Sequence, residues 1–295
     1  MRVVLLKRKL TSFQIIIIGF FCVIIFGTFL LMLPFSSRSG LATPFFEALF
    51  TSTSAVCVTG LIIHDTATYW SVFGQIVILL LIQIGGMGVI TVAASFAMIS
   101  GRKISLMQRS TMQEAISAPK VGGIVRLTGF IVRGTLVMEL LCAAVMAPVF
   151  CRDFGKKGLW MALFHSVSAF CNAGFDLLGV RTPFSSLTSY AANPVINFTI
   201  MFLIVVGGIG FLTWDDIRAN RLHLRKYRMQ SKVILCTTAV LLIIPAMYFY
   251  FFEFDDLTRK ERLLSSLFQA VTPRTAGFNT VELTDLSEAG QFITI

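Results

Sequence analysis

Five apolar stretches, each long enough to cross a lipid bilayer, constrain the fold of this chain more than any other feature. They occupy residues 13–33, 72–99, 127–150, 195–214 and 233–252. A helix needs about 20 apolar residues to cross the hydrocarbon core of a bilayer, and each stretch meets that length. Only 14% of the 295 residues are charged, too few to cover the surface of a soluble domain of this size. The sequence therefore predicts an all-α, multi-pass membrane protein.

The distribution of positive charge predicts how the chain is oriented. Residues 1–12, 99–126 and 215–232 hold 15 of the 25 lysine and arginine residues. Loops rich in these residues stay on the cytoplasmic side, so we expect the three segments and the N-terminus inside. The net charge of +10 reflects this asymmetry. Aromatic residues on which bases could stack are not interleaved with these charges, so no binding of nucleic acid is expected. The expected surroundings are the lipid bilayer of the cytoplasmic (inner) membrane.

Three further apolar runs are too short to cross a bilayer. They cover residues 44–55, 158–169 and 261–271, each between or beside the longer stretches. Runs of 10 to 14 residues are typical of buried or re-entrant helices. We expect these runs to enter the membrane from the outside and to end within it.

Three sequences ending in glycine reveal an internal repeat. They are TSTSAVCVTG (51–60), HSVSAFCNAG (165–174) and FQAVTPRTAG (268–277). They align without gaps on Gly60, Gly174 and Gly277, which are 114 and 103 residues apart, and each follows one of the short apolar runs. The sequences IGGMGVIT (84–91) and VGGIGFLT (206–213) also match each other. Two matches in the same order indicate a repeated unit of span, short helix, glycine strand and span.

The repeat divides the chain into pore-like units around one central path. The first repeat covers residues 1–100, the second 124–216, and the third 232–295. The third is expected to be cut off where its second span begins, which makes residues 1–295 a single incomplete membrane domain.

The residue types in the glycine sequences favour a cation path. A re-entrant helix that runs inward points its C-terminal end, which is partially negative, at the membrane centre. Non-helical backbone is tolerated at that depth when it lines a water-filled cavity, and its carbonyl groups can replace the hydration shell of an ion. Glycine keeps such a strand narrow and permits unusual φ values. No ring of acidic side chains occupies these positions, so the backbone carbonyls would provide any selectivity.

The sequences TSAVCVTGL, FCNAGF and AVTPRTAGFN, with LIQIGGMG and VGGIGF, resemble those of the Trk/Ktr/HKT superfamily of potassium transporters, above all the bacterial Ktr membrane subunit. The resemblance covers the whole chain. It implies potassium uptake, often sodium-dependent, by a homodimer on a cytoplasmic ring of nucleotide-binding regulatory subunits. It places the ion next to filter residues in all three repeats. These are Val56, Cys57, Val58, Thr59, Gly60, Cys171, Asn172, Ala173, Gly174, Thr275, Ala276 and Gly277.

Members of this superfamily have four such repeats, and the fourth is absent from this sequence. Three glycine strands cannot close a four-fold cage of carbonyl groups. One expectation is that the chain is a piece of a longer transporter. The alternative is a truncated, non-conducting membrane fragment that only associates with intact subunits.

Other polar residues within the apolar segments are weaker candidates. Glu139 lies in the middle of a predicted span, where a carboxylate is either functional or held by structural hydrogen bonds. Asp65 follows the first glycine strand and either attracts cations or is an ordinary solvated loop residue. Asn172 is expected to brace its strand. Cys57 and Cys171 are expected to pack behind the strands.

The sequence offers no sign of an enzyme or of a resident cofactor. The three histidines are scattered and show no metal-ligand spacing, so no metal beyond the transported K⁺ or Na⁺ is expected. The six cysteines show no CxxC spacing and lie mostly in apolar segments. No nucleophile motif or pair of catalytic carboxylates is present.

Overall fold

The computed structural model describes residues 11–100, 104–118, 122–221 and 223–295. The orientation predicted from the sequence depends partly on basic residues outside these ranges. They include Lys7, Arg8, Lys9, Arg102, Lys103 and Lys120.

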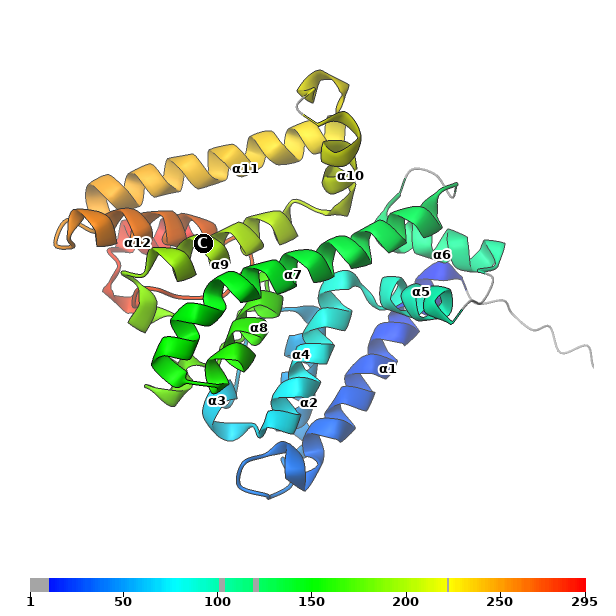
Figure 1. Ribbon diagram of the computed structural model, residues 1–295, viewed down its shortest axis with the longest axis horizontal. Coiled ribbons are helices and arrows are strands. Elements are labelled where there is room, and N and C mark those ends of the chain that lie inside the picture. Colours follow the sequence, from blue (N-terminus) through cyan, green and yellow to red (C-terminus); the bar gives the residue numbers. More distant parts are fainter. Residues whose placement is uncertain (1–10, 101–103, 119–121, 222) are drawn as a thin grey trace, which may run out of the picture.

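The described part of the chain is helical (Figure 1). Its α-helices are α1 (Ser12–Met32), α2 (Phe45–Cys57), α3 (Thr66–Tyr69), α4 (Val72–Met87), α5 (Val89–Ile99), α6 (Leu106–Ile116), α7 (Ile124–Phe154), α8 (Lys157–Phe170), α9 (Pro194–Gly208), α10 (Phe211–Asn220), α11 (Met229–Tyr248), α12 (Arg259–Val271) and α13 (Glu288–Thr294). Shorter turns are η1 (Pro34–Ser36), η2 (Leu178–Val180), η3 (Thr188–Tyr190), η4 (Leu224–Lys226), the π-helical η5 (Phe249–Glu253) and η6 (Leu283–Asp285). This architecture confirms the predicted all-α class.

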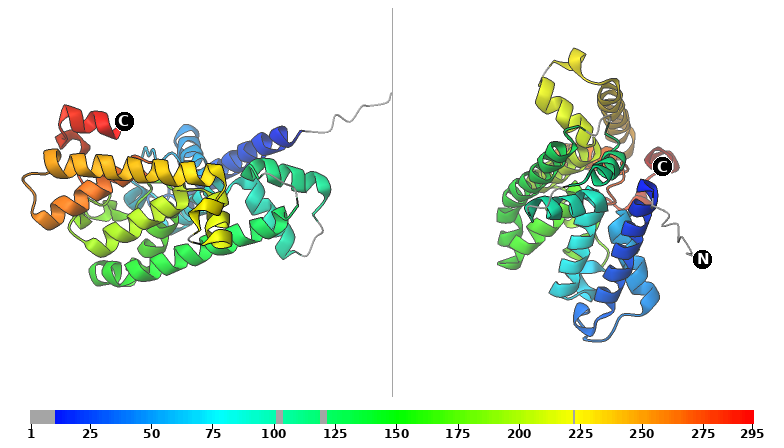
Figure 2. Two further views of the ribbon diagram at one scale, coloured as in Figure 1. Left: turned by 90° about the horizontal axis from the view of Figure 1, so that it is seen from above. Right: turned by 90° about the vertical axis from the view of Figure 1, so that its right-hand side faces the viewer.

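The three units follow one another across the molecule (Figure 1). In the first, the short helix α2 packs against both α1 and α4, and in the second α8 packs against both α7 and α9. In the third, α12 packs against α11, and α13 at the chain end is joined to η5 by the hydrogen bond that Ser287 donates to Glu253 (Figure 2). Neighbouring units meet through α4 with α8 and through α9 with α12. The predicted short runs are therefore helices enclosed by longer ones.

Three of the five predicted spans are continuous helices of sufficient length and apolarity. They are Ser12–Met32, Ile124–Phe154 and Met229–Glu253. The other two predicted spans, 72–99 and 195–214, reach that length and apolarity when the two helices within each are taken together as one broken span. Each is a pair of helices, bent by 96° between α4 and α5 and by 94° between α9 and α10.

A glycine makes each of these bends. Gly88 and Gly210 are the last glycines of the two matching GGxG sequences, and both have φ of +82°. That backbone conformation is costly for residues with a β-carbon, and it cannot continue a right-handed helix. The residues on both sides of Gly88 and Gly210 are equally apolar, so hydropathy averaged along the sequence does not show where the helices bend.

The core lies around the three short helices. The residues Leu264, Phe268 and Val271 recur every three to four positions on α12 and are buried, and Phe164 is fully buried on α8. Such spacing places apolar side chains on one helix face. Thr258 caps the start of α12 by accepting a hydrogen bond from the amide group of Glu261.

Candidate functional site

Three short stretches of backbone, here called the glycine segments, follow the short helices, directly in the first unit, after one residue in the second and after three in the third. They are residues 58–60, 172–174 and 275–277. Each has positive φ at its first and third residues and not at the second. The values are 57° and 76° for Val58 and Gly60, 56° and 71° for Asn172 and Gly174, and 73° and 75° for Thr275 and Gly277. Successive carbonyl groups point to opposite sides of an ordinary strand, whereas alternation in the sign of φ can turn them toward the same side.

Hydrogen bonds hold each glycine segment on the end of its own short helix. The amide groups of Thr59, Ala173 and Ala276 donate to helix carbonyl oxygens at 2.9, 2.8 and 3.0 Å. The acceptors are, in the same order, Ser54, Ser168 and Thr272. These amide groups therefore bind the segments to their own helices. The carbonyl groups of the segments are not used in these hydrogen bonds and can bind an ion.

The three glycine segments lie next to one another although they are far apart in the sequence. A β-carbon on Gly60 would lie 2.8 Å from the carbonyl oxygen of Ala173. A β-carbon on Gly174 would lie 2.7 Å from the carbonyl oxygen of Ala276, and 3.1 Å from the α-carbon of Gly277. No side chain fits at these positions, so each glycine is required by close approach as well as by its backbone conformation.

The first residues of two segments are held in a conformation that their side chains disfavour. Val58 and Thr275 are β-branched and have φ values of 57° and 73°. A β-branched residue in the left-handed region is a true outlier, costs on the order of 1–3 kcal/mol, and persists where the surroundings enforce it. Such strain is concentrated at functional sites.

The first glycine of each GGxG sequence allows a short helix to pack closely against the bent span. A β-carbon on Gly85 would overlap the carbonyl oxygen of Val56, and one on Gly207 would overlap that of Phe170. Val56 and Phe170 occupy equivalent places in the repeat, 114 residues apart. The matched motifs therefore have a matched contact, which brings the end of each short helix against the bent span.

A second contact recurs between the short helices and the first spans. The hydroxyl group of Ser52 donates to the carbonyl oxygen of Ile24 at 2.8 Å, and that of Ser166 to the carbonyl oxygen of Glu139 at 2.7 Å. Glu139 of the second unit therefore makes the same backbone contact as Ile24 of the first. Its side chain is 2% exposed and faces Gln83 of α4.

Two cavities adjoin the glycine segments. One, of about 390 Å³, is lined by Cys57, Gly85, Gly86, Asn172 and Thr275, among others. The other, of about 510 Å³, lies between the first and third segments and is lined by residues of both, including Thr59 and Gly277. The first and second segments touch, as do the second and third, whereas this cavity separates the third from the first.

The structure corrects the predicted extent of the first strand. Val56 and Cys57 form the last turn of α2 instead of belonging to an extended segment. Val56 is 1% exposed and packs against Gly85. The packing expected for Cys57 is also wrong, because its side chain is exposed and lines the smaller cavity.

Two residues of the second segment have the surroundings that the sequence suggested. Cys171 is 8% exposed, and a β-carbon on Gly86 would lie 2.5 Å from its sulfur atom. The side-chain amide of Asn172, with its nitrogen turned toward them, donates to the carbonyl oxygens of Ala169 and Ile204 at 3.1 and 3.2 Å. It thereby joins α8 to α9.

Asp65 is neither solvated nor free. It is 6% exposed and its Oδ1 accepts hydrogen bonds from the amide groups of Ala67 and Thr68 at 3.1 and 2.8 Å. Its Oδ2 accepts from the amide group of Phe184 at 3.1 Å, which links the loops that follow the glycine segments of the first two units. An ordinary solvated loop residue is therefore the wrong description of Asp65.

Asp176, two residues beyond Gly174, is a buried carboxyl group that the sequence analysis missed. It is 8% exposed, and its Oδ1 accepts from the amide group of Leu178 at 2.9 Å. Burial, with the nearby charge of Asp65, raises the pKa of Asp176 to about 6, against the lowering effect of its backbone hydrogen bonds.

Several serines that hold the segments were also missed, although the aligned sequences contain the signal. Ser52 and Ser54 match Ser166 and Ser168 in the alignment on glycine. The hydroxyl group of Ser168 donates to the carbonyl oxygen of Phe175 at 2.7 Å, and that of Thr59 donates to the hydroxyl oxygen of Ser54 at 2.9 Å. Ser54 and Ser168 thus use different hydrogen bonds for the same purpose, which is to tie the end of a short helix to the residues that follow it.

The arrangement suits a cation without its hydration shell. Carbonyl oxygens can replace water around an alkali ion. The C-terminal ends of α2, α8 and α12, which are partially negative, lie beside the glycine segments and also favour a cation there. Within the described residues, no group of three histidine, cysteine or acidic side chains could hold a metal ion.

Comparison with known proteins agrees with this geometry. The family model described as "TrkH: Cation transport protein" matches residues 7–295. The chain is 41% identical to the "Potassium/sodium uptake protein NtpJ" of Enterococcus hirae, covering 98% of the chain and 64% of that protein. It is 39% identical to the "Ktr system potassium uptake protein B" of Bacillus subtilis, covering 95% and 63%, and 34% identical to the protein of the same name in Vibrio alginolyticus, covering 98% and 64%. The chain thus spans slightly less than two thirds of the length of these relatives.

Proposed function

This chain belongs to the TrkH family of cation transport proteins, and we propose that it contributes a potassium path to an uptake system of the cytoplasmic membrane. Membership places it among transport proteins rather than enzymes. The observation that carries the proposal is the contact of Gly60, Gly174 and Gly277, each on the C-terminal end of a short helix. The ion would lie against the carbonyl oxygens of these segments.

Residues 58–60, 172–174 and 275–277 would form the ion site directly. Cys57 and Cys171 would lie at its inner end, and Val56 would support it from behind. Asp65 would act as a positioning residue, since its two oxygens hold the loops of the first two units together instead of facing an open mouth.

The cavity between the first and third segments supports a path with a fourth contribution. It has a volume of about 510 Å³ and is lined by Val58, Thr59 and Ala276 with Gly277. Gln269, fully buried beside it, has no hydrogen-bond partner for either side-chain polar atom among the described residues. A buried amide requires partners, and a further strand packed in this cavity would supply them.

The ion preference and the assembly rest on the relatives. Their names state potassium uptake or potassium/sodium uptake, and that of the Bacillus subtilis protein states that it is part of a system. We extend potassium as the cargo to this chain, with sodium dependence left open. We also extend to it a homodimer on a cytoplasmic nucleotide-binding ring, with the N-terminus inside.

The proposal is tested by potassium and sodium uptake in cells that lack their own potassium transporters. The cells express the complete native reading frame with any cytoplasmic partner encoded beside it. We expect potassium uptake that Gly60→Asp abolishes, since a carboxylate would enter the carbonyl site. Unchanged preference for potassium over sodium in Gly60→Asp would remove Gly60 from the site. A protein that is present in the membrane but takes up neither ion would overturn the proposed path.

A further inference from the structure

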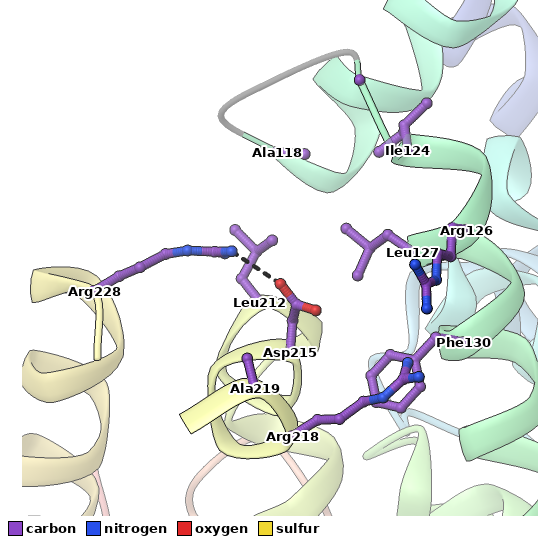
Figure 3. A pocket seen from close by; sticks show the side chains of 12 residues that line it. Ala118, Ile124, Arg126, Leu127, Phe130, Leu212, Asp215, Arg218, Ala219 and Arg228 are labelled. Carbon is purple, nitrogen blue, oxygen red and sulfur yellow. Dashed lines mark hydrogen bonds and ion pairs between the residues drawn. The ribbon is translucent and has the colours of Figure 1, made fainter. Parts of the chain in front are cut away.

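A pocket at the start of α7 combines positive charge with an apolar floor (Figure 3). It has a volume of about 630 Å³ and lies between α7 and α10, far along the chain from the glycine segments. Arg126, Arg218 and Arg228 line it, together with Asp215 and apolar side chains that include Phe130. We call it the basic pocket.

Two of the three arginines in the basic pocket keep an uncompensated charge. Arg228 pairs with Asp215 at 2.9 Å and with Asp216 at 3.4 Å. Arg218 lies over the ring of Phe130, with 4.6 Å from its guanidinium carbon to the ring centroid. Neither Arg218 nor Arg126 has a carboxylate within 4.0 Å among the residues that the structure describes.

The backbone adds to this positive potential. Helix α7 has 31 residues and begins at Ile124, after Gly123, with no side chain accepting hydrogen bonds from its first amide groups. The amino end of a long helix carries a partial positive charge and exposes unpaired N–H groups, which favour phosphate. Gly122 and Gly123 also line the pocket, and a β-carbon on either would meet no atom within 4 Å.

The basic pocket continues into an apolar groove on the same helix. The groove, of about 370 Å³, shares Phe130 and Arg218 with the pocket and is otherwise lined by Gly134, Val137, Met138, Val206, Ile209, Trp214 and Ile217. The positions from Arg126 to Met138 extend over about 18 Å of helix, similar to the ~15 Å thickness of one leaflet's hydrocarbon.

We propose that the basic pocket and the apolar groove together bind one anionic phospholipid. Its phosphodiester lies against Arg126, Arg218 and the first turn of α7, and an acyl chain follows the groove past Val137. A soluble phosphate compound would pair with the arginines but would leave the apolar groove empty. The headgroup of a zwitterionic lipid carries its own positive charge, which the arginines would repel. The predicted cytoplasmic side of this helix end is where such lipid sites occur.

The test measures lipid binding to the full-length native chain in detergent, by native mass spectrometry with phosphatidylglycerol and phosphatidylcholine. We expect preference for phosphatidylglycerol, and about 25-fold weaker binding in the double variant Arg126→Ala/Arg218→Ala, at roughly fivefold for each arginine. The control Arg225→Ala/Lys226→Ala removes the same charge from η4, outside the pocket, and should bind within about twofold of the parent.

The groove is tested separately with Val137→Trp, which fills it from α7. The matched control is Val145→Trp, equally exposed on the same helix and outside the groove. Only Val137→Trp should weaken phosphatidylglycerol binding. Equal losses in the arginine variant and its control would overturn the proposal. Displacement of the lipid by inorganic phosphate or a nucleotide, with no effect of Val137→Trp, would overturn it in favour of a soluble anion. An acidic peptide that binds the parent in place of the lipid would overturn it in favour of a protein partner.

Discussion

The carbonyl oxygen of Ala276 lies 2.7 Å from the position that a β-carbon on Gly174 would take. These residues are about a hundred positions apart and belong to different units. The space between the second and third glycine segments therefore does not admit a single methyl group. Gly174 has the same close relation to the third segment that Gly60 has to the second.

Gly174→Ala is expected to abolish selective potassium uptake. The methyl group would displace the carbonyl oxygen of Ala276, and the φ of +71° adds about 1–2 kcal/mol of backbone strain. The control is Gly40→Ala, which has the same φ of +71° but no atom within 4 Å of its β-carbon. Uptake by Gly40→Ala should remain within twofold of the parent. Equal effects would attribute the loss to backbone strain alone.

Gly207→Ala is expected to lower the stability of the full-length protein. The new methyl group would overlap the carbonyl oxygen of Phe170 and push α8 away from α9, at a cost of about 1–3 kcal/mol. In Gly129→Ala, on α7, the methyl group meets no atom within 4 Å and should stabilise the helix by about 0.5–1 kcal/mol. Thermal unfolding in detergent should therefore shift in opposite directions, and a shared direction would contradict this close packing.

Cys57 should react with a cationic thiol reagent, and Cys171 should not. Both thiols line the cavity of about 390 Å³, but Cys57 is exposed there, whereas Cys171 is only 8% exposed and lies against Gly86. In variants that retain only one of the two cysteines, we expect modification at Cys57 to block uptake. Reaction at Cys171 should be at least about tenfold slower. Comparable rates would show that both thiols face water.

Glu139→Gln is expected to leave uptake within about twofold of the parent. The side chain of Glu139 is buried, faces Gln83, and lines neither cavity beside the glycine segments. A glutamine keeps the volume and a polar end toward Gln83, while Glu139→Leu would place a hydrocarbon side chain against that buried amide and cost about 1–3 kcal/mol. Loss of uptake in Glu139→Gln, with normal stability, would instead assign the carboxylate to the transport path.

Asp176→Asn should stabilise the protein at neutral pH. Burial raises the pKa of Asp176 to about 6, so the folded protein holds a proton that the unfolded chain releases near pH 4. The folded state is therefore favoured below pH 4 by this group, and it loses that advantage as pH rises toward 6. Replacing the carboxyl group should remove a penalty of up to about 3 kcal/mol at pH 7. Thermal unfolding between pH 4 and 7 measures both the shift and the flatter profile; an unchanged profile contradicts the prediction.

The sequence was sufficient to predict the three short helices and the glycines that follow them. The repeat supplied what hydropathy could not, because an alignment on Gly60, Gly174 and Gly277 does not depend on the length of apolar runs. The bends at Gly88 and Gly210 escaped prediction because apolar composition does not report φ. Their glycines were nevertheless present in both matching motifs.

Two features of the site were beyond single-sequence reasoning. Valine at position 58 adopts a left-handed conformation that its side chain disfavours, so its local preference points the wrong way. The burial of Asp65 depends on Phe184, which is more than a hundred residues away in the chain. Such contacts follow from the packing of the units against each other, which no local pattern in the sequence reports.

The contact between Gly174 and the third segment also sets the order in which the site is made during biosynthesis. At 5–20 residues per second, roughly 5–20 s separate the synthesis of these two parts of the chain. In that interval, the hydrogen bond from Ala173 to the carbonyl group of Ser168 can already hold the second segment on its own helix. Each segment is thus shaped locally before it meets its neighbours, and the contact between Gly174 and the third segment forms only after the third short helix has been made.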